Sequence, residues 1–262
     1  MRTELVSEPG SPDRPNEDFA SVGLPASGQG GSLIVLDGVT PPRGETGCLH
    51  SVPWFTARLG GALTELTVSC RDLTLAEILA RAILRTAEAH ATTCDLSHPR
   101  TSQATVVLAR WSPLELEYLV LSDSALLVDS PAGEVTVVLD ERLSRLPRAA
   151  RATDELIDAT LRNKEGGFFT AAADPSVAAR AVTGSLPRAG VRAFAALTDG
   201  ATRWVEKFGR GDWAECFALV EKEGAAELVR RVRALERADT EERTYLRRSK
   251  THDDATVGYV EL

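Results

Sequence analysis

The segment SLIVLDG (residues 32–38) is a continuous apolar run that stops at an Asp-Gly pair. Short apolar runs that end in a turn dipeptide are typical of buried β-strands. The same arrangement returns at residues 192–197, where a second apolar run leads towards Asp199-Gly200. A carboxylate just after a buried strand is thus a repeated feature of the chain, and both occurrences predict an Asp at the edge of a sheet.

Predicted strands and helices occur in groups along the rest of the chain. β-favouring runs separated by short turns predict an antiparallel meander over residues 104–110, 114–121, 125–128 and 134–139. Further strands are predicted at residues 17–24 and 255–260, and a loop at residues 7–15. Helical patterns mark residues 52–68, 73–93, 141–164 and 212–248. Antiparallel strands with segregated helices favour an α+β layered fold over a βαβ Rossmann type.

Length and charge narrow the class of protein. The 262 residues, 43% of them hydrophobic, can form a full core without disulfides. No fixed-period repeat or disordered linker divides the sequence, so we predict a single domain over residues 1–262. The 38 acidic and 30 basic residues give a net charge of −8, which disfavours nucleic acid as a partner. An acidic pocket can still bind an anionic substrate once a divalent cation has reversed its local charge.

The sequence shows no clear pattern for a membrane span, a signal peptide or a zinc-binding cysteine motif. The sequence has no apolar run of the roughly 18 residues that a membrane span needs, and residues 1–16 lack the apolar core of a signal peptide. We therefore expect a cytoplasmic monomer without a membrane partner. Cys48, Cys70, Cys94 and Cys216 form no CxxC pair, whereas zinc sites normally use ligands close in sequence. Free, mostly buried thiols are predicted, and no structural zinc site.

Acidic residues stand beside several predicted strands. Asp18 and Asp253 precede strands, Asp37 and Asp199 follow them, and Asp123 occupies a turn. Each alone could simply cap a turn. If the strand ends converge, however, the carboxylates repel one another unless a cation neutralises them. Oxygen ligands without coupled His or Cys favour Mg²⁺ or Mn²⁺, and two such ions about 3.5–4 Å apart can activate a bridging water for attack on a phosphoryl group.

Five short motifs occur in order over nearly the full length of the chain. They are NEDFA (residues 16–20), VLDG (35–38), LSDS (121–124), LTDG (197–200) and DDAT (253–256). Residues 101–107, TSQATVV, add a small-residue strand between the second and third motifs. Together they resemble the metal-dependent (2C-type) serine/threonine protein phosphatase family in a divergent bacterial form. The resemblance implies an αββα sandwich of two antiparallel β-sheets flanked by helices, with a binuclear Mn²⁺ or Mg²⁺ site at one end.

The resemblance also implies metal-binding roles. Asp37 would bridge the two metals, and the Gly38 carbonyl would help to bind one of them. Asp199 and Asp253 would complete the shell of the other metal.

Three further acidic residues take supporting roles in the implied site. Glu17 would act on the first metal, with Asp18 as a partner behind it. Asp123, together with Asp199, is similar to the pair that holds a third, weaker metal in bacterial members of the family.

Two departures from the family pattern concern the substrate. The family usually places an Arg four residues before the Glu of its first motif, where this chain has Asp13, with Arg14 one residue nearer. Arg14 is predicted to bind the substrate phosphate, the alternative being a solvated loop charge. Residues 39–42, VTPP, replace the run that carries a proton-donating His in some relatives.

Other residues near the motifs receive simpler interpretations. His50 and His98 are interpreted as surface or core histidines rather than replacement acids. Arg43 is interpreted as a solvated charge, the alternative being a residue that helps to bind substrate. Phe168 and Phe169 lie in a segment expected to shape substrate access. They are either exposed recognition residues or packing residues.

The leading hypothesis is a metal-dependent protein phosphatase that hydrolyses phosphoserine or phosphothreonine in a protein substrate. Metal-activated water would attack phosphorus directly, with Asp37, Asp199 and Arg14 as catalytic residues. The first alternative is a catalytically weak or inactive phosphatase-fold module that acts by partner binding. The shifted Arg14 and the altered loop after Gly38 favour it, whereas retention of every direct metal-ligand position opposes it. The second alternative is an acidic structural domain without metal.

Overall fold

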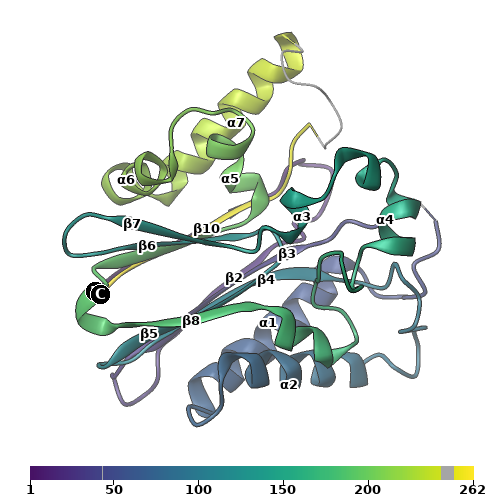
Figure 1. Ribbon diagram of the computed structural model, residues 1–262, viewed down its shortest axis with the longest axis horizontal. Helices are drawn as coiled ribbons and strands as arrows, with labels where there is room; N and C mark the ends of the chain where they lie inside the picture. Colours follow the sequence, from purple (N-terminus) through teal and green to yellow (C-terminus); the bar gives the residue numbers. More distant parts are fainter. Residues whose placement is uncertain (43, 243–250) are drawn as a thin grey trace.

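The computed structural model is a sandwich of two antiparallel five-stranded sheets between two layers of helices (Figure 1). It describes residues 1–42, 44–242 and 251–262. This architecture confirms the α+β class and the αββα sandwich predicted from the sequence.

Strands from both ends and the middle of the chain form each sheet. Across the first sheet they are β1 (Arg2–Glu8), β10 (Ala255–Glu261), β9 (Ala193–Leu197), β6 (Ala125–Asp129) and β7 (Val135–Leu139). Across the second they are β2 (Phe19–Gly23), β3 (Gly31–Gly38), β4 (Ala104–Trp111), β5 (Glu115–Leu121) and β8 (Val182–Pro187).

Helices cover the outer face of each sheet (Figure 1). The second sheet carries α1 (Val52–Ser69) and α2 (Leu75–Glu88), and the first carries α5 (Asp199–Glu206), α6 (Trp213–Glu223) and α7 (Ala225–Glu242). Shorter segments are α3 (Arg142–Arg145), η1 (Arg148–Arg151), α4 (Asp154–Thr160), η2 (Pro175–Arg180) and η3 (Arg188–Gly190). Every helix in the described part of the chain is too short or too polar to cross a lipid bilayer.

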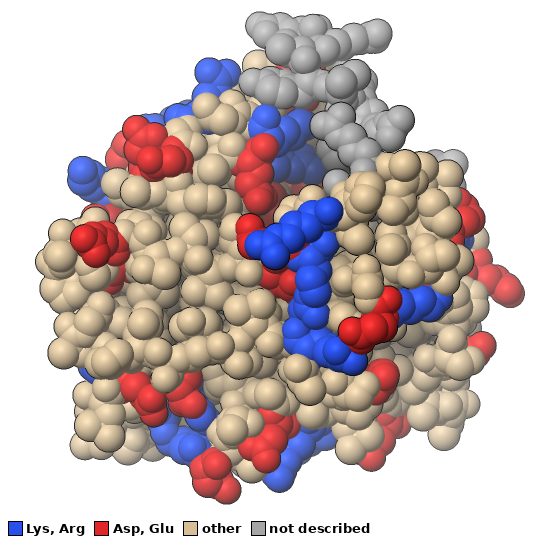
Figure 2. Space-filling view, viewed as in Figure 1, with Lys and Arg blue, Asp and Glu red and all other residues tan. Residues whose placement is uncertain are grey.

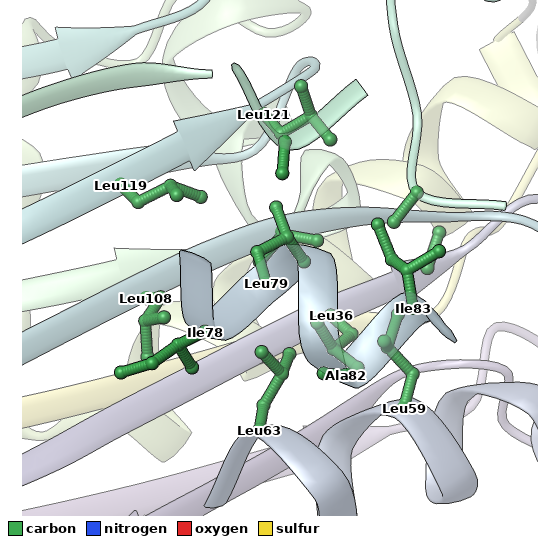
Figure 3. Close-up of a cluster of buried hydrophobic side chains, with 14 of the residues drawn as sticks. Leu36, Leu59, Leu63, Ile78, Leu79, Ala82, Ile83, Leu108, Leu119 and Leu121 are labelled. Atoms are coloured by element: carbon green, nitrogen blue, oxygen red, sulfur yellow. The ribbon is translucent and has the colours of Figure 1, made fainter. Parts of the chain in front are cut away.

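Strand β3 is apolar throughout because both of its faces are buried. Leu33 and Val35 pack between the two sheets. Ile34 and Leu36 point the other way and join the core under α1 and α2. Figure 3 shows Leu36 among the leucines and isoleucines of these helices. Successive side chains of a strand face opposite sides, so two separate cores require an unbroken apolar run.

Helix α2 begins and packs as its sequence indicates. Thr74 accepts a hydrogen bond from the Glu77 amide, and the Glu77 carboxylate accepts one from the Thr74 amide, which forms a capping box. Ile78, Leu79 and Ile83 are fully buried on one face (Figure 3). Leu79 and Ile83 are four residues apart and Ile78 adjoins Leu79, so all three lie on the side of the helix that covers the sheet.

Charged side chains of both signs share the surface. Figure 2 shows basic side chains lying next to acidic ones on the face seen in Figure 1. Ion pairs among the described residues include Arg142–Asp140 and Arg192–Asp129, each 2.6 Å long.

The predicted meander is wrong. β4 pairs with β5 and β6 pairs with β7, but β5 and β6 belong to different sheets. The chain crosses from one sheet to the other at residues 122–124. A crossing and a hairpin use similar turn residues, so the local pattern did not separate them.

Other elements also differ from the sequence prediction, and strand β8 is one that was not predicted. Strand β1 was not predicted, although it pairs with β10 along its whole length. The predicted helical segment at residues 141–164 is broken into α3, η1 and α4. Pro147 lies between α3 and η1 and cannot continue a helix begun before it.

Candidate metal centre

Five aspartates lie close together, and four of them line a cleft with residues of α3 and α4. Figure 1 shows these two helices at one end of the sandwich. Asp37 lies at the end of β3, Asp199 begins α5 just after β9, and Asp253 precedes β10. Asp123 lies where the chain crosses between the sheets, and Asp18 precedes β2. Each of the other four acts electrostatically on Asp37. The strand ends therefore converge as the sequence analysis expected.

Two adjoining clefts open over this end. One, of about 240 Å³, is lined by Asp37, Gly38, Asp123, Asp199 and Asp253. The other, of about 420 Å³, has Arg14 and Glu17 in its wall and shares Asp253 and Thr40 with the first. Predicted metal ligands and the predicted phosphate ligand thus face connected spaces.

Burial and mutual repulsion raise the pKa values of these carboxyl groups. Burial raises the pKa of Asp18 to about 7. Burial, followed by the charges of Asp253 and Asp123, raises the pKa of Asp199 to about 8. Burial and the Asp199 charge hold the pKa of Asp37 well above its ordinary value of 3.8. Carboxylates that repel one another in this way favour a bound cation, which would displace their protons.

One oxygen of Asp18 lacks a protein partner. Asp18 Oδ2 accepts hydrogen bonds from the hydroxyls of Thr198, at 3.0 Å, and Thr256, at 2.7 Å. Asp18 Oδ1 is buried and has no hydrogen-bond partner among the described residues. Leaving a buried acceptor unpaired costs about 1–3 kcal/mol. The two threonines hold the carboxylate in one orientation, with its unpaired oxygen available to a cation or to a cation's water.

Asp254 fixes the loop that carries Glu17 and Arg14. Its two carboxylate oxygens accept the backbone N–H groups of Gly10 and Glu17, each at 2.7 Å. The Thr40 hydroxyl donates to the Glu17 carboxylate. Asp254 therefore supports the site through the backbone, and Thr40 adds a contact that the sequence analysis missed.

Gly38 occupies a position where a side chain does not fit. A Cβ there would lie 2.5 Å from the Glu17 carbonyl oxygen and would overlap Val52. The absence of a Cβ lets the end of β3 approach the residue before Asp18. The Asp37-Gly38 pair thus brings the first two motifs into contact.

Asp123 is held by a strained turn. Ser122 has a φ of 70°, which is unusual for a residue with a side chain. Its amide donates to Asp140 Oδ2 at 3.0 Å, and Arg142 pairs with that carboxylate at 2.6 Å. The Ser122 hydroxyl donates to Asp123 Oδ1 at 3.1 Å. This arrangement directs Asp123 into the smaller cleft.

The sequence analysis missed an arginine beside Asp253. Arg203, four residues after Asp199 on α5, donates to Asp253 Oδ2 at 2.9 Å and to Glu236 Oε1 at 2.5 Å. Glu236 is completely buried and also accepts from Arg233 at 2.8 Å. Removing one partner of such a buried pair leaves an uncompensated charge. No local spacing pointed to this network, because the partners of Arg203 lie 33 and 50 residues away in the sequence.

The structure decides the interpretation of most of the remaining residues near the motifs. Phe168 and Phe169 are buried, so the packing alternative holds and exposed recognition does not. Phe168 lines the smaller cleft together with Arg162, a residue that the sequence analysis did not select. His98 accepts the Arg100 amide, at 3.1 Å, as a structural histidine would. Arg43 lies outside the described residues.

The donor set matches the ions predicted from the sequence. The residues that line the smaller cleft offer carboxylate and carbonyl oxygens, which hard divalent cations such as Mn²⁺ and Mg²⁺ prefer. Asp37, Gly38, Asp199 and Asp253 line the smaller cleft, and Glu17 lines the adjoining one.

An αββα sandwich with carboxylates at one end is the architecture of the metal-dependent phosphatases that the sequence resembles. The sequence model of the family described as Protein phosphatase 2C matches residues 11–238. The chain therefore belongs to the protein phosphatase 2C family, whose members generally use Mn²⁺ or Mg²⁺.

Solved structures share the fold at low sequence identity. The serine/threonine phosphatase Stp1 from Staphylococcus aureus is 11% identical, with a TM-score of 0.64 over 100% of this chain and 95% of its own. PstP/Ppp from Mycobacterium tuberculosis is 17% identical, with a TM-score of 0.63 over 100% and 98%. PppA from Pseudomonas aeruginosa is 15% identical, with a TM-score of 0.60 over 99% and 96%. No curated protein matches the chain by sequence.

Proposed function

We propose that the chain is a metal-dependent serine/threonine protein phosphatase that hydrolyses phosphomonoesters of a phosphorylated protein substrate. The observation that carries the proposal is the convergence of Asp18, Asp37, Asp123, Asp199 and Asp253 at one end of the sandwich. Membership of the protein phosphatase 2C family and the similarity of the fold to Ser/Thr phosphatases support it.

The proposal assigns two metal positions to these residues. Asp37, the Gly38 carbonyl and Glu17 would hold one ion, and Asp37, Asp199 and Asp253 the other. Asp123 with Asp199 would hold a third, weaker ion. Two bound Mn²⁺ or Mg²⁺ ions would supply a water of lowered pKa for in-line attack on phosphorus and would neutralise the carboxylates.

The chain's own residues position the reactants. Arg14, in the wall of the larger cleft, would bind two phosphate oxygens through its planar guanidinium. Asp254 fixes the loop that carries Arg14. Thr198 and Thr256 fix Asp18, and Arg203 fixes Asp253. These contacts hold the groups in place before substrate binds, which lowers the entropic cost of catalysis.

A second candidate is a regulatory module of low turnover that acts by partner binding. The observation that favours it is the ion pair between Arg203 and Asp253, 2.9 Å long. A cation already bound to a predicted metal ligand competes with the metal for that carboxylate. The phosphatase candidate predicts efficient hydrolysis of phosphomonoesters, whereas the regulatory candidate predicts little or none.

The test is hydrolysis of p-nitrophenyl phosphate and of a phosphothreonine peptide at saturating Mn²⁺. We expect the wild type to be active, and Asp37→Asn and Asp199→Asn to lose at least about 100-fold in kcat/KM. Asp72→Asn, at an exposed position outside both clefts, is the matched control and should keep full activity. Equal, negligible rates for all four proteins would reject the catalytic proposal. Calorimetric Mn²⁺ binding without turnover would then favour the regulatory candidate.

A further inference from the structure

Two cysteines and two histidines meet in a cluster that the carboxylate site does not use. Its members are Cys48, His50, His90 and Cys94, and one potential ligand atom of each lies within 4.8 Å of all the others. The sequence prediction of mostly buried cysteines without a shared site is therefore wrong. Of the four cysteines, only Cys216 is buried, and Cys48 and Cys94 lie side by side. His50 is also more than an isolated surface or core histidine.

The cluster joins two segments that are far apart in sequence. Cys48 and His50 lie in the loop that leads into α1, and His90 and Cys94 follow the end of α2. The Cys94 amide donates to the His90 carbonyl at 3.0 Å, so a helical turn places both side chains on one side. Next to the cluster, the Asp95 amide donates to the Gly47 carbonyl at 2.7 Å. The backbone thus holds both segments together at the cluster.

The distances approach those of tetrahedral zinc coordination. Zinc bonds of about 2.3 Å to sulfur and 2.0–2.1 Å to nitrogen place sulfur and nitrogen ligands about 3.5 Å apart and two sulfurs about 3.8 Å apart. Cys48 Sγ lies 3.4 Å from His90 Nδ1 and 3.8 Å from His50 Nδ1. Cys94 Sγ lies 3.4 Å from His50 Nδ1 and 3.0 Å from Cys48 Sγ. Among these four pairs the two sulfurs depart most from the tetrahedral spacing and have to separate by less than about 1 Å.

We propose that Cys48, His50, His90 and Cys94 form a tetrahedral Cys₂His₂ zinc site that fastens the loop before α1 to the end of α2. Two thiolates and two neutral imidazoles carry the charge and the softness that zinc prefers. The Mn²⁺ or Mg²⁺ proposed for the carboxylate site prefers oxygen, so each site selects its own metal.

Surrounding groups favour a thiolate at Cys94, whereas burial and the hydrogen bond with Cys94 raise the pKa of the Cys48 thiol. The Leu49 amide donates to Cys94 Sγ at 3.3 Å. Burial opposes ionisation of Cys94, but hydrogen bonds involving Cys48, the Leu49 amide and His50 lower the pKa of its thiol to about 5. The Trp54 ring stacks on His50 with centroids 3.9 Å apart and limits rotation of that imidazole. Such outer contacts orient the ligands of a metal.

A disulfide between Cys48 and Cys94 is the main competing interpretation. A disulfide needs an S–S distance of about 2.05 Å, shorter than the 3.0 Å seen here. It would also give no role to the two imidazole nitrogens that face the sulfurs. His90 is 2% exposed, and its Nδ1 faces Cys48 Sγ. Zinc satisfies all four groups together.

The site would act on the carboxylate centre through the chain between them. The loop that zinc would hold begins directly after Gly38 and includes Thr40, which contacts Glu17 and lines both clefts. Residues 39–50 contain no helix or strand among those described, so tertiary contacts have to fix this loop. Zinc would be a structural ligand here, with no direct part in hydrolysis.

The proposal is tested by metal content and by cobalt spectroscopy. Protein purified under reducing conditions should contain one zinc per chain by mass spectrometry of the metal. Co²⁺ added to zinc-depleted protein should give the thiolate charge-transfer band and the intense visible bands of tetrahedral coordination. Cys48→Ser and His50→Asn should lower the zinc content to below about 0.2 per chain, since four-ligand sites lose affinity steeply with a ligand. Cys70→Ser, a half-buried cysteine outside the cluster, is the control and should keep one zinc.

The outcomes separate zinc from its competitor and from the proposed function. Wild-type protein that binds neither zinc nor tetrahedral Co²⁺ under reducing conditions would overturn the proposal. A Cys48–Cys94 disulfide that persists in reductant, detected as a mass two hydrogens lower, would overturn it as well. These measurements detect only metal bound by the thiolates. Their result therefore does not depend on whether the protein hydrolyses phosphate.

Discussion

Arg14 lies on an exposed loop, yet its position in the wall of the larger cleft is defined. The loop is tied to Asp254 by the amides of Gly10 and Glu17, and the Arg14 amide donates to the Ser11 carbonyl at 3.3 Å. The one-residue shift from the usual family position is therefore accommodated by the backbone. Arg14 lines the same cleft as Glu17 and Asp253, where the proposed function would place the phosphate.

Replacing Arg14 should weaken phosphate binding without affecting the metals. We expect Arg14→Ala to raise KM for a phosphopeptide about tenfold, because a charge-assisted hydrogen bond contributes about 1.5–3 kcal/mol. Mn²⁺ affinity, measured by calorimetry, should stay at the wild-type value. Arg81→Ala, an exposed arginine on α2, is the control and should change neither quantity. An unchanged KM for Arg14→Ala would point to another phosphate ligand, with Arg43 the next to replace.

At the residue scale, sequence reasoning identified the residues that short local motifs specify. Asp37 was predictable because it lies at the end of the buried strand β3. Asp199 was predictable because it comes two residues after the buried strand β9. Arg203 and the Cys48 cluster were not, since their partners are brought together by the packing of whole helices. The pairs Cys48-x-His50 and His90-x₃-Cys94 were visible in the sequence, but nothing local indicated that they would meet.

Helix α1 connects the packing of the second sheet to the metal centre. Gly60 faces β2, where a Cβ would overlap the Phe19 ring, whereas a Cβ on Gly61 would meet open space. Phe19 directly follows Asp18. The contact between Gly60 and Phe19 therefore determines where the first residue of β2, and the carboxylate before it, lie.

These neighbouring glycines provide a matched pair of variants. We expect Gly60→Ala to lower the free energy of unfolding by about 1–3 kcal/mol, since overpacking shifts Phe19 and its backbone. Gly61→Ala should raise it by up to about 1 kcal/mol through helix propensity alone. Urea unfolding measures both changes. Gly60→Ala should also reduce Mn²⁺ affinity, and a stability equal to that of Gly61→Ala would contradict the packing described.

At the element scale, helices were easier to predict than strand connections. The apolar face of α2 and its capping box are local, and the helix formed within the predicted residues 73–93, although it ends at Glu88. Strand β1 exists because β10, about 250 residues later, pairs with it. The chain passes from one sheet to the other at Ser122, which has a positive φ. None of the residue types in the LSDS motif indicates a positive φ at this position. Such features depend on partners distant in sequence, which periodicity does not report.

At the scale of the whole molecule, the proposed metal binding would conflict with the stability of the native state without metal. Its net charge is −8, and the carboxylates at one end of the sandwich add local repulsion when they ionise. The native state without metal reduces this repulsion by keeping protons on Asp18 and Asp199, whose pKa values are about 7 and about 8. In the unfolded chain the same groups return to their ordinary pKa of 3.8 and lose those protons at lower pH. Stability and metal binding therefore depend on pH in opposite directions.

The sign of the pH dependence follows from proton counting. Between about pH 4 and pH 8 the native state binds more protons at Asp18 and Asp199 than the unfolded state does. The stability that these groups contribute is complete at the acidic end of this window and is lost as pH rises through their native pKa values. Saturating Mn²⁺ would replace the protons, so its stabilising effect should grow over the same range.

We therefore expect the free energy of unfolding of protein without Mn²⁺ to fall between pH 5 and pH 8, and saturating Mn²⁺ to flatten that decline. Urea titrations at pH 5, 6.5 and 8, with and without Mn²⁺, measure both slopes. Asp199→Asn removes one of the proton-binding groups and should reduce the slope without Mn²⁺, whereas Asp72→Asn should leave it unchanged. A stability that rises with pH in the absence of Mn²⁺ would show that these carboxylates are already ionised in the native state. Mutual repulsion would then no longer explain why this end of the sandwich should bind cations.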